Sequence, residues 1–458
     1  MVVFTIDSIV KKKIAAGSIF VLTGQVLEII LGIINNVIIA RAFGSANFGI
    51  YTLFLKICNI AGLLARVGTN DVIVKYVGIT SGVGDWSKLK GYIRTAFQIM
   101  FIGSSVTIIF ISMISQFLAT NLFTSPCLYK VLIFSVLIIP LQNSLLLTRE
   151  IFRGLLDLKT ASFLPAGQQL VFFGLLVSII LLGTHNVQNI VIALSVGIFC
   201  ALVVALFRLR GRLLKWHAKP EKVKMQGLLQ ESVPMMLTRG SLLFMSSTDI
   251  LVLGIYASPA EVGIYGVVNA LAAITVFSFD IVNQVIPAMI ARYSAQKDFK
   301  TLSYVIRYAS TLGVLFALPV FILVTCFGEF ILTNIFGTQY AGGIIALYIL
   351  LAGRFFTSLS GSTGYLLQMT GFHTILTRIS VCCGLLNLLL NIALVQQYGK
   401  EGAAGATAIS LALQNFIVLV IAYRKTGIWA LASVNIGKDI VNQVWSYLKT
   451  ATGNTKIN

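Results

Sequence analysis

Long apolar segments alternate with short polar ones along almost the whole chain. A helix crosses the hydrocarbon core of a bilayer with about 20 consecutive apolar residues. The pattern predicts twelve such helices, six in each half of the sequence. They cover residues 14–40, 48–70, 92–118, 128–148, 161–182 and 187–207, then 232–257, 261–288, 303–327, 341–364, 372–397 and 402–423. An even number of spans places both termini on the same side of the membrane.

Three motifs occur twice at a nearly constant separation of 213 or 214 residues. FGIY at 48–51 matches VGIY at 262–265, DWSKLKGYIRTA from Asp85 matches DFKTLSYVIRYA from Asp298, and QFLATNLF from Gln116 matches EFILTNIF from Glu329. These repeats predict two tandem copies of one six-helix bundle. Because each copy has an even number of spans, both enter the membrane from the same side, so the repeats are parallel. Tandem bundles are typical of transporters, with a substrate site where the halves face each other.

The predicted domain boundaries follow from these spans. They are a cytoplasmic N-terminus (1–13), an N-lobe (14–207), a basic cytoplasmic linker (208–231), a C-lobe (232–424) and a cytoplasmic tail (425–458). In the tail, apolar residues recur at helical spacing beside Lys438 and Lys449. This pattern predicts a helix on the inner membrane surface, and a disordered tail is the alternative.

Composition and charge support a membrane protein of defined orientation. Hydrophobic residues make up 57% of the chain and charged residues 11%, and the mean hydropathy is +0.92, more apolar surface than a soluble fold can bury. The net charge of +19 comes from basic residues between apolar segments. Of the 34 Lys and Arg residues, only Arg41 and Lys400 fall in predicted outer loops. The positive-inside rule therefore predicts that both termini are cytoplasmic, and no nucleic-acid partner is expected.

Seven ionisable residues lie well inside predicted spans. The cations are Lys56, Arg66, Arg239 and Arg354, and the carboxylates are Glu28, Asp249 and Asp280. Each charge costs about 2.5–3.5 kcal/mol at the centre of a spanning helix, so these residues should face a wet cavity or one another. The cations are candidates for contact with an anionic substrate. The carboxylates are candidates for coupling to H+ or Na+.

Structural ion pairs are the alternative for the same residues. Arg66 and Asp280 both lie near the cytoplasmic ends of their helices and could tie the two lobes together. Arg239, Lys56 and Arg354 could pair with Glu28 or Asp249.

The first predicted helix carries a polar stripe made of Gln25, Glu28 and Asn35. Their spacing puts them on one face, which should point to the protein interior. The repeat offset matches Gln25 with Arg239, Asn35 with Asp249, and Arg66 with Asp280. We therefore expect Gln25 and Asn35 to line the cavity as polar residues.

The sequence predicts a protein that is not an enzyme. It contains no GxxxxGK[ST], HExxH or GxSxG motif and no Cys/His spacing for a metal, so neither a cofactor nor a bound metal is expected. A membrane-embedded polymerase or acyltransferase is disfavoured because the predicted outer loops are short.

The chain resembles bacterial polysaccharide and O-antigen flippases. The resemblance lies in ARAFG at 40–44 followed by ANFGIY at 46–51, and in DILVLG at 249–254 followed by EVGIY at 261–265. It covers residues 10 to 425 and extends to the superfamily of multidrug and toxin extruders and peptidoglycan-precursor flippases. The resemblance implies two six-helix bundles in a V-shaped exporter fold with a cationic central cavity.

The function implied by this resemblance is translocation of an undecaprenyl-pyrophosphate-linked oligosaccharide across the bacterial cytoplasmic (inner) membrane. The predicted partners are this substrate, membrane lipids, a coupling H+ or Na+, and a polysaccharide polymerase and glycosyltransferases. A cation-coupled multidrug exporter is the alternative on the same scaffold. The excess of cations over carboxylates inside the spans favours the anionic cargo.

Overall fold

A computed structural model describes residues 8–438, apart from 217, 278, 280–282, 284–285, 434 and 437. The regular elements of this described part are helices. The predicted surface helix after Lys438 and the candidate Asp280 lie outside the described residues. The described chain divides into two compact units, Met1–Gly266 and Val267–Asn458.

The first unit begins with α1, a long helical element that is broken at Gly44, and ends within α10. Its elements are α1 (Ser8–Arg66), α2 (Thr69–Val83), α3 (Trp86–Phe117), η1 (Leu118–Leu122), α4 (Pro126–Leu132), α5 (Ser135–Gly154), α6 (Leu158–Leu181), α7 (Val187–Lys215), α8 (Met225–Met245), α9 (Thr248–Tyr256) and the start of α10 (Pro259–Ile274). The unit therefore includes α8 and α9, which the predicted C-lobe also contains. The assignment of α8 and α9 to the C-lobe stays a prediction.

The second unit repeats this helical architecture. Its elements after α10 are α12 (Ile286–Ala295), α13 (Phe299–Phe330), η2 (Ile331–Phe336), η3 (Thr338–Gly343), α14 (Ile344–Ser360), α15 (Thr363–Met369) and α16 (His373–Thr426). Its core gathers buried side chains of α12, α13, α15 and α16, including Ile290, Leu302, Leu366 and Ala422. Close packing of these apolar side chains holds the helices together.

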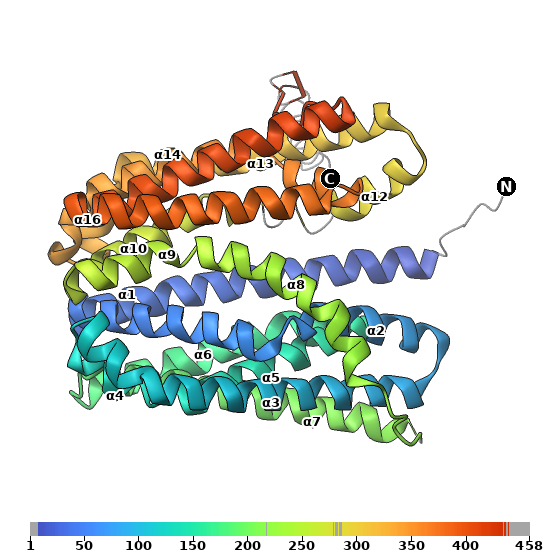
Figure 1. The fold of residues 1–458 in the computed structure, drawn as a ribbon, viewed down its shortest axis with the longest axis horizontal. Coiled ribbons are helices and arrows are strands. Elements are labelled where there is room, and N and C mark those ends of the chain that lie inside the picture. The colour runs from blue at the N-terminus through green and yellow to red at the C-terminus, as the bar shows by residue number, and fades with distance from the viewer. Residues whose placement is uncertain are drawn as a thin grey trace, which may run out of the picture. The chain divides into compact units, whose positions relative to one another are not determined.

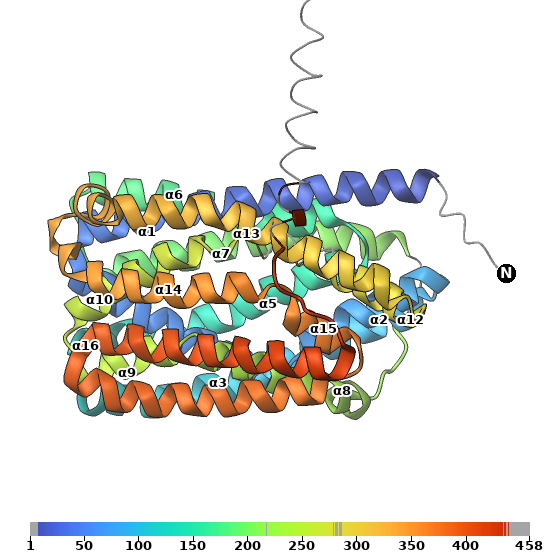
Figure 2. The ribbon, with the colours of Figure 1, turned by 90° about the horizontal axis from the view of Figure 1, so that it is seen from above.

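Seven helices in the described residues are long and apolar enough to cross a membrane, or up to nine if each of two bent pairs is one span. Two of the seven, α1 and α16, contain a non-helical glycine, Gly44 and Gly399. Both lie where the sequence predicts a loop between two spans. The ribbon reverses direction within α1 and within α16 (Figure 1 and Figure 2). The protein is thus a multi-pass helical membrane protein, and the count of twelve spans stays a prediction.

Large apolar side chains remain exposed on the outside of these helices. Leu181 is 82% exposed, Phe207 80% and Met113 78%. In water such surfaces would associate or aggregate, whereas in lipid they are the preferred exterior. The exposed surface therefore agrees with the composition in placing these helices in a bilayer.

The structure reproduces the tandem repeat element by element. Asp85 caps α3 by accepting a hydrogen bond from the backbone N–H of Lys88 at 3.0 Å, and Asp298 caps α13 in the same way from Thr301 at 3.1 Å. Both helices are 32 residues long, and both continue into a π-helical turn, η1 or η2. The predicted duplication is therefore confirmed in helix length, cap and terminating turn.

Two glycines of the duplicated FGIY and VGIY motifs meet where α1 crosses the start of α10. A Cβ atom added to Gly49 would lie 1.8 Å from the carbonyl oxygen of Pro259, and one added to Gly263 would lie 1.9 Å from that of Ser45. Neither contact leaves room for a methyl group. Each copy of the motif therefore supplies the glycine that lets the two backbones approach, as small residues do in membrane helix pairs.

The glycine crossing can be tested with Gly49→Ala and Gly263→Ala. Each methyl group would press on a backbone oxygen, so the helices must separate, and overpacking of this kind costs about 1–3 kcal/mol. We expect a lower melting temperature for each purified variant in detergent, measured by thermal-shift fluorescence. Gly32→Ala, on the same helix with nothing within 4 Å of its added Cβ, is the control and should melt no lower than the wild type. Equal melting temperatures for all three variants would contradict the proposed role of the crossing.

Candidate functional site

Helix α8 packs along the second half of α1 and along α2, and we call this contact the α8 seam. The helices are antiparallel, because Lys56 contacts Ser246 at one end of the seam and Lys75 contacts Glu231 at the other. A Cβ on Gly240 would lie 3.3 Å from Leu63, and one on Gly68 would lie 2.3 Å from the carbonyl oxygen of Ser232. Gly68 also has φ of 74°, a left-handed conformation that favours glycine. The break between α1 and α2 therefore both turns the chain and admits α8.

Two of the predicted substrate-binding cations lie on this seam. The Lys56 ammonium donates a hydrogen bond to the carbonyl oxygen of Ser246 at 2.9 Å, at the end of α8. Arg239 of α8 forms an ion pair with Asp71 of α2, with 3.1 Å between Nη2 and Oδ1. The Arg239 side chain is 66% exposed, so this pair lies in an open position and is weak.

The end of the seam farthest from Lys56 has a second ion pair. Lys75 and Glu231 are 2.8 Å apart, and the Tyr76 hydroxyl donates to the same carboxylate at 2.7 Å. These hydrogen bonds, from Lys75 first and then Tyr76, hold the pKa of Glu231 below its usual value. The same hydrogen bond to Glu231 raises the pKa of Tyr76 to about 12. Glu231 is therefore a carboxylate, and Tyr76 a neutral donor, throughout the physiological range.

Arg66 ends α1 close to the seam but turns toward α5. Its Nη1 donates to the Asn143 side-chain oxygen at 2.7 Å, and the Asn143 amide in turn donates to Ser104 at 3.3 Å. The negative charge of Asp71 also acts on Arg66. A neutral amide orients this guanidinium without cancelling its charge. Asp280, the predicted partner of Arg66, lies outside the described residues, so that pairing stays untested.

Glu28 is half-buried on the first half of α1. The positive charge that acts on it is that of Arg149, near the end of α5. In the described part of the chain, the buried Nε of Arg149 has no hydrogen-bond partner. A buried guanidinium atom with unused hydrogen-bonding capacity marks a position where a ligand, an ion or water would be stabilised.

The polar stripe on α1 divides between two environments. Asn35 is buried, with 1% of its surface exposed, and its amide donates to the Gln169 side chain at 2.8 Å and to the Gln169 backbone at 3.1 Å. Gln25 is half-buried. Asn35 thus joins α1 to α6 inside the first unit, and this contact accounts for its burial. A role for either residue in lining a cavity stays a prediction.

Asp249 is deeply buried at the start of α9. Its carboxylate accepts hydrogen bonds from the Tyr265 hydroxyl and from the backbone N–H of Ile250, both at 2.8 Å. Tyr265, the last residue of the VGIY motif, is fully buried. These contacts give Asp249 a structural function, fixing α9 to α10. Its predicted function in ion coupling stays untested.

Arg354 belongs to the second unit. Its Nη2 donates to the side-chain oxygen of Asn269 on α10 at 2.6 Å, and the side chain is half-buried. As with Arg66, the described partner is a neutral amide.

The candidate charges of the first unit meet in small groups. Arg66 and Arg239 both interact with the one carboxylate of Asp71, and Arg149 acts on Glu28, while Lys56 donates to a backbone carbonyl oxygen at the end of α8. Two guanidinium groups around one carboxylate favour an anion over a cation beside Asp71. Guanidinium groups suit phosphate in particular, because their planar donors match its oxygens.

Three contributors escaped the sequence analysis: Asn143, Arg149 and Asp71. Arg149 and Asp71 lie one residue beyond the predicted spans 128–148 and 48–70, so the sequence places them in inner loops. Asn143 is uncharged and therefore does not stand out among the ionisable residues. The adjacent amides Gln142 and Asn143 in the middle of an apolar segment are a signal that could have found it.

The duplicated helices, the apolar exterior and the charged residues within the spanning segments define a polytopic membrane transporter fold. A family model described as polysaccharide biosynthesis protein matches residues 14–293, more than half of the chain. The chain belongs to that family. A second model, MatE, matches residues 234–393.

Individual relatives agree with this assignment. The chain is 24% identical over 406 residues to the "probable low-salt glycan biosynthesis flippase Agl15" of Haloferax volcanii, covering 86% of this chain and 82% of the relative. Among solved structures, an inward-facing multidrug resistance MATE family transporter of the MOP superfamily matches with a TM-score of 0.73 at 12% identity, covering 90% of this chain and 98% of that one. The lipid II flippase MurJ, in an inward closed conformation, matches with a TM-score of 0.71 at 13% identity, covering 96% and 93%. These structures show that the fold is that of MOP superfamily transporters.

The ion pair at the end of the seam predicts a pH-dependent contribution to stability. Because the pKa of Glu231 is lower in the folded protein, the contribution is complete above the ordinary glutamate value, about 4.3, and is lost as the pH falls through the lowered value. At pH 7, Glu231→Gln should melt below the wild type in detergent. The difference between the two melting temperatures should shrink as the pH falls below about 4.3 and through the lowered pKa of Glu231. A difference that stays constant across this range would contradict the assignment.

Proposed function

We propose that this protein is a flippase that moves an undecaprenyl-pyrophosphate-linked oligosaccharide across the cytoplasmic membrane by alternating access, driven by an ion gradient. The observation that carries the proposal is the pair of arginines, Arg66 and Arg239, around the one carboxylate of Asp71 in a member of a polysaccharide biosynthesis family. A pyrophosphate is a multiply charged anion, and its passage through a bilayer requires compensating positive charge. The name of the Haloferax volcanii relative supports the same substrate class.

Arg66 and Arg149 are the residues best prepared to compensate this charge. A guanidinium has five N–H donors, and the contact of Arg66 with Asn143 uses one of them. The buried Nε of Arg149 has no partner in the described residues. Arg239 and Lys56 add positive charge along the seam. We assign the substrate's phosphates to these cations, and Arg354 to the corresponding function in the second unit.

Alternating access requires contacts that form and break at low cost. The ion pairs of the α8 seam suit this requirement, because Arg239 and Lys75 are both at least half exposed. Exposed pairs contribute roughly 0–1 kcal/mol. The seam can therefore open without a large barrier, and substrate phosphate can compete with Asp71 for Arg239.

Glu28 is our candidate for ion coupling in the first unit. It is half-buried, and the charge of Arg149 acts on it. Binding of H+ or Na+ to Glu28 would release Arg149 to an anion, and binding of the anion would favour loss of the cation. This competition would couple transport of the cation to transport of the anionic substrate through Glu28 and Arg149.

A multidrug exporter is the second candidate. The match to MatE over residues 234–393 and the likeness to MATE structures favour it. The charge balance argues against it, because a site for cationic drugs should carry more carboxylates than cations. Asp249 does not help this candidate, since Tyr265 and a backbone amide already engage its carboxylate.

Location and partners follow from the proposal. We place the protein in a bacterial cytoplasmic membrane with both termini in the cytoplasm, as the positive-inside rule predicts. Glycosyltransferases would supply its substrate on the cytoplasmic face, and a polysaccharide polymerase would use the product on the outer face.

Deletion of the gene in its native host tests the overall function. We expect a completed lipid-linked oligosaccharide to accumulate on the cytoplasmic side, detected by extraction and mass spectrometry, and surface polysaccharide to fall. Unchanged glycolipid together with altered dye efflux would overturn the flippase and support the exporter.

Two variants of the Arg239–Asp71 pair test the assignment of the cations. If Arg239 binds substrate, Arg239→Ala should lower surface polysaccharide about tenfold, the equivalent of about 1.4 kcal/mol, while Asp71→Asn should retain or raise it because Arg239 is released. Arg41→Ala removes an exposed cation in a predicted outer loop and serves as the control. Equal losses in Arg239→Ala and Asp71→Asn, at normal membrane levels, would show that the pair acts only as a structural tie.

A further inference from the structure

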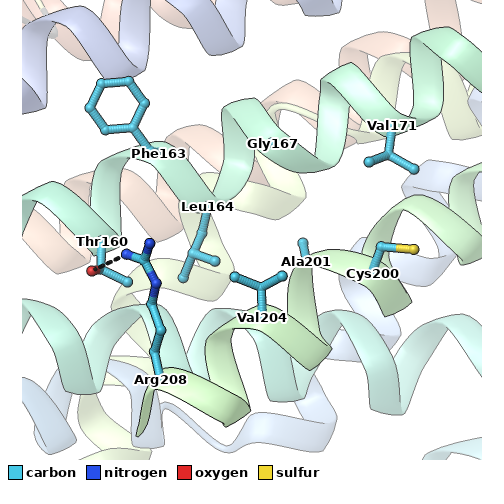
Figure 3. A pocket seen from close by; sticks show the side chains of 9 residues that line it. All are labelled: Thr160, Phe163, Leu164, Gly167, Val171, Cys200, Ala201, Val204 and Arg208. Atoms are coloured by element: carbon cyan, nitrogen blue, oxygen red, sulfur yellow. Dashed lines mark hydrogen bonds between the residues drawn. The ribbon is translucent and has the colours of Figure 1, made fainter.

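A cavity of about 250 Å³ lies between α6 and α7 in the first unit (Figure 3). Its walls are apolar, with the buried side chains of Leu164 and Ala201 at the base and the exposed Val204 on the rim. Figure 3 shows that these residues come from the two facing helices and that Arg208 closes one end. None of the residues assigned above to the substrate lines this cavity.

Gly167 leaves open space along one wall of the cavity. It lines the wall, and a Cβ atom added to it would meet nothing within 4 Å. The space beside it is thus open, and any larger residue would project into it. In lipid, an apolar groove of this kind is filled by hydrocarbon chains, because water has no polar partners there.

The end of the cavity at Arg208 carries a positive charge. Nη1 of Arg208 donates to the Thr160 hydroxyl at 3.0 Å, and Thr160 donates in turn to Asp157 at 2.8 Å. The ion pair described at this end joins Asp157 to Arg212, with 2.5 Å between Nη2 and Oδ2. Arg212 therefore neutralises Asp157, while the partner described for Arg208 is a neutral hydroxyl.

The length of the cavity matches one leaflet of a bilayer. From Arg208 to Cys200, at the other end of the α7 wall, the helix rises about 12 Å at 1.5 Å per residue. This is close to half of the ~30 Å hydrocarbon core. Under the predicted orientation, Arg208 lies at the cytoplasmic surface and the groove extends from it into the inner leaflet.

We propose that this cavity is a binding site for an anionic phospholipid of the inner leaflet, with one acyl chain in the groove and the phosphate on Arg208. Charge complementarity selects this occupant. Arg208 and Arg212 lie against the single carboxylate of Asp157 at this end, which leaves a net positive charge, so a headgroup with its own ammonium would be repelled. Basic sites between spanning helices on the cytoplasmic side bind anionic lipids for this reason. The lipid bridges α6 and α7 and stabilises the first unit, whatever the transported cargo is.

The experiment uses the full-length protein purified in detergent, with phosphatidylglycerol or phosphatidylcholine of identical chains added. We expect phosphatidylglycerol to raise the melting temperature more, as ligand binding to the folded state requires, and to remain bound in native mass spectrometry. Equal effects of the two lipids on the wild type would overturn the proposal. A larger effect of undecaprenyl phosphate, with displacement of phosphatidylglycerol, would also overturn it by assigning the groove to a polyprenyl chain.

Matched variants locate the effect. Gly167→Leu should place its side chain in the groove, since an added Cβ meets nothing within 4 Å, and should raise the apparent Kd for phosphatidylglycerol about tenfold or more. Gly174→Leu is the control, because Gly174 lies seven residues further along α6, also faces open space, and does not line the cavity. Arg208→Ala should remove the preference for phosphatidylglycerol while leaving weak binding of both lipids.

If Gly167→Leu does not give folded protein, Val204→Phe at the half-exposed rim of the cavity replaces it. Undiminished preference for phosphatidylglycerol in Arg208→Ala, or undiminished affinity in a folded groove-filling variant, would refute the site.

Discussion

The absence of water from the hydrocarbon core of the bilayer determines how this chain folds. Backbone groups must be satisfied within each segment, so the described regular elements are helices. The apolar side chains that a soluble protein would bury face outward here, as Phe207 does. Charged side chains cannot do the same, and the structure turns Arg66 to Asn143 and Arg239 to Asp71. The lack of water makes these charged residues costly to place in the membrane. It also suits them to binding a substrate, because each makes few contacts and those contacts can be exchanged.

Two kinds of contact hold α1, α2, α8 and α10 together, and they differ in strength. At the Gly49–Gly263 crossing, backbone lies against backbone with no side chain between, which fixes the geometry within a fraction of an ångström. Along the seam, by contrast, ion pairs such as Lys75–Glu231 are half exposed and individually weak. The crossing thus fixes α10 against α1, whereas α8 depends along much of the seam on weak ion pairs, apart from the close approach of Ser232 to Gly68. Weak pairs of this kind can exchange partners at low cost.

Much of the architecture follows from the sequence, because hydrophobic length and repetition are local properties. The predicted spans 92–118 and 303–327 correspond to α3 and α13, although the helices begin earlier, at Trp86 and Phe299, because Asp85 and Asp298 cap polar turns outside the apolar segment. The partners of the charged residues were not predictable. They depend on how each helix is rotated and crossed, which single-chain periodicity does not determine. Thus the carboxylate beside Arg239 is Asp71, and the cation that acts on Glu28 is Arg149. The repeated motifs can be read from the sequence. The contact between Gly49 and the equivalent glycine of the second copy, Gly263, cannot.

The matching π-helical turns after α3 and α13 bear on the evolutionary origin of the two halves. A wide turn of this kind commonly ends a helix, because the last carbonyl groups accept hydrogen bonds from amides further along the chain. Both halves contain it at corresponding positions, Leu118–Leu122 and Ile331–Phe336. A shared way of ending the third long helix agrees with the descent of both halves from one bundle that already ended its helix in this way.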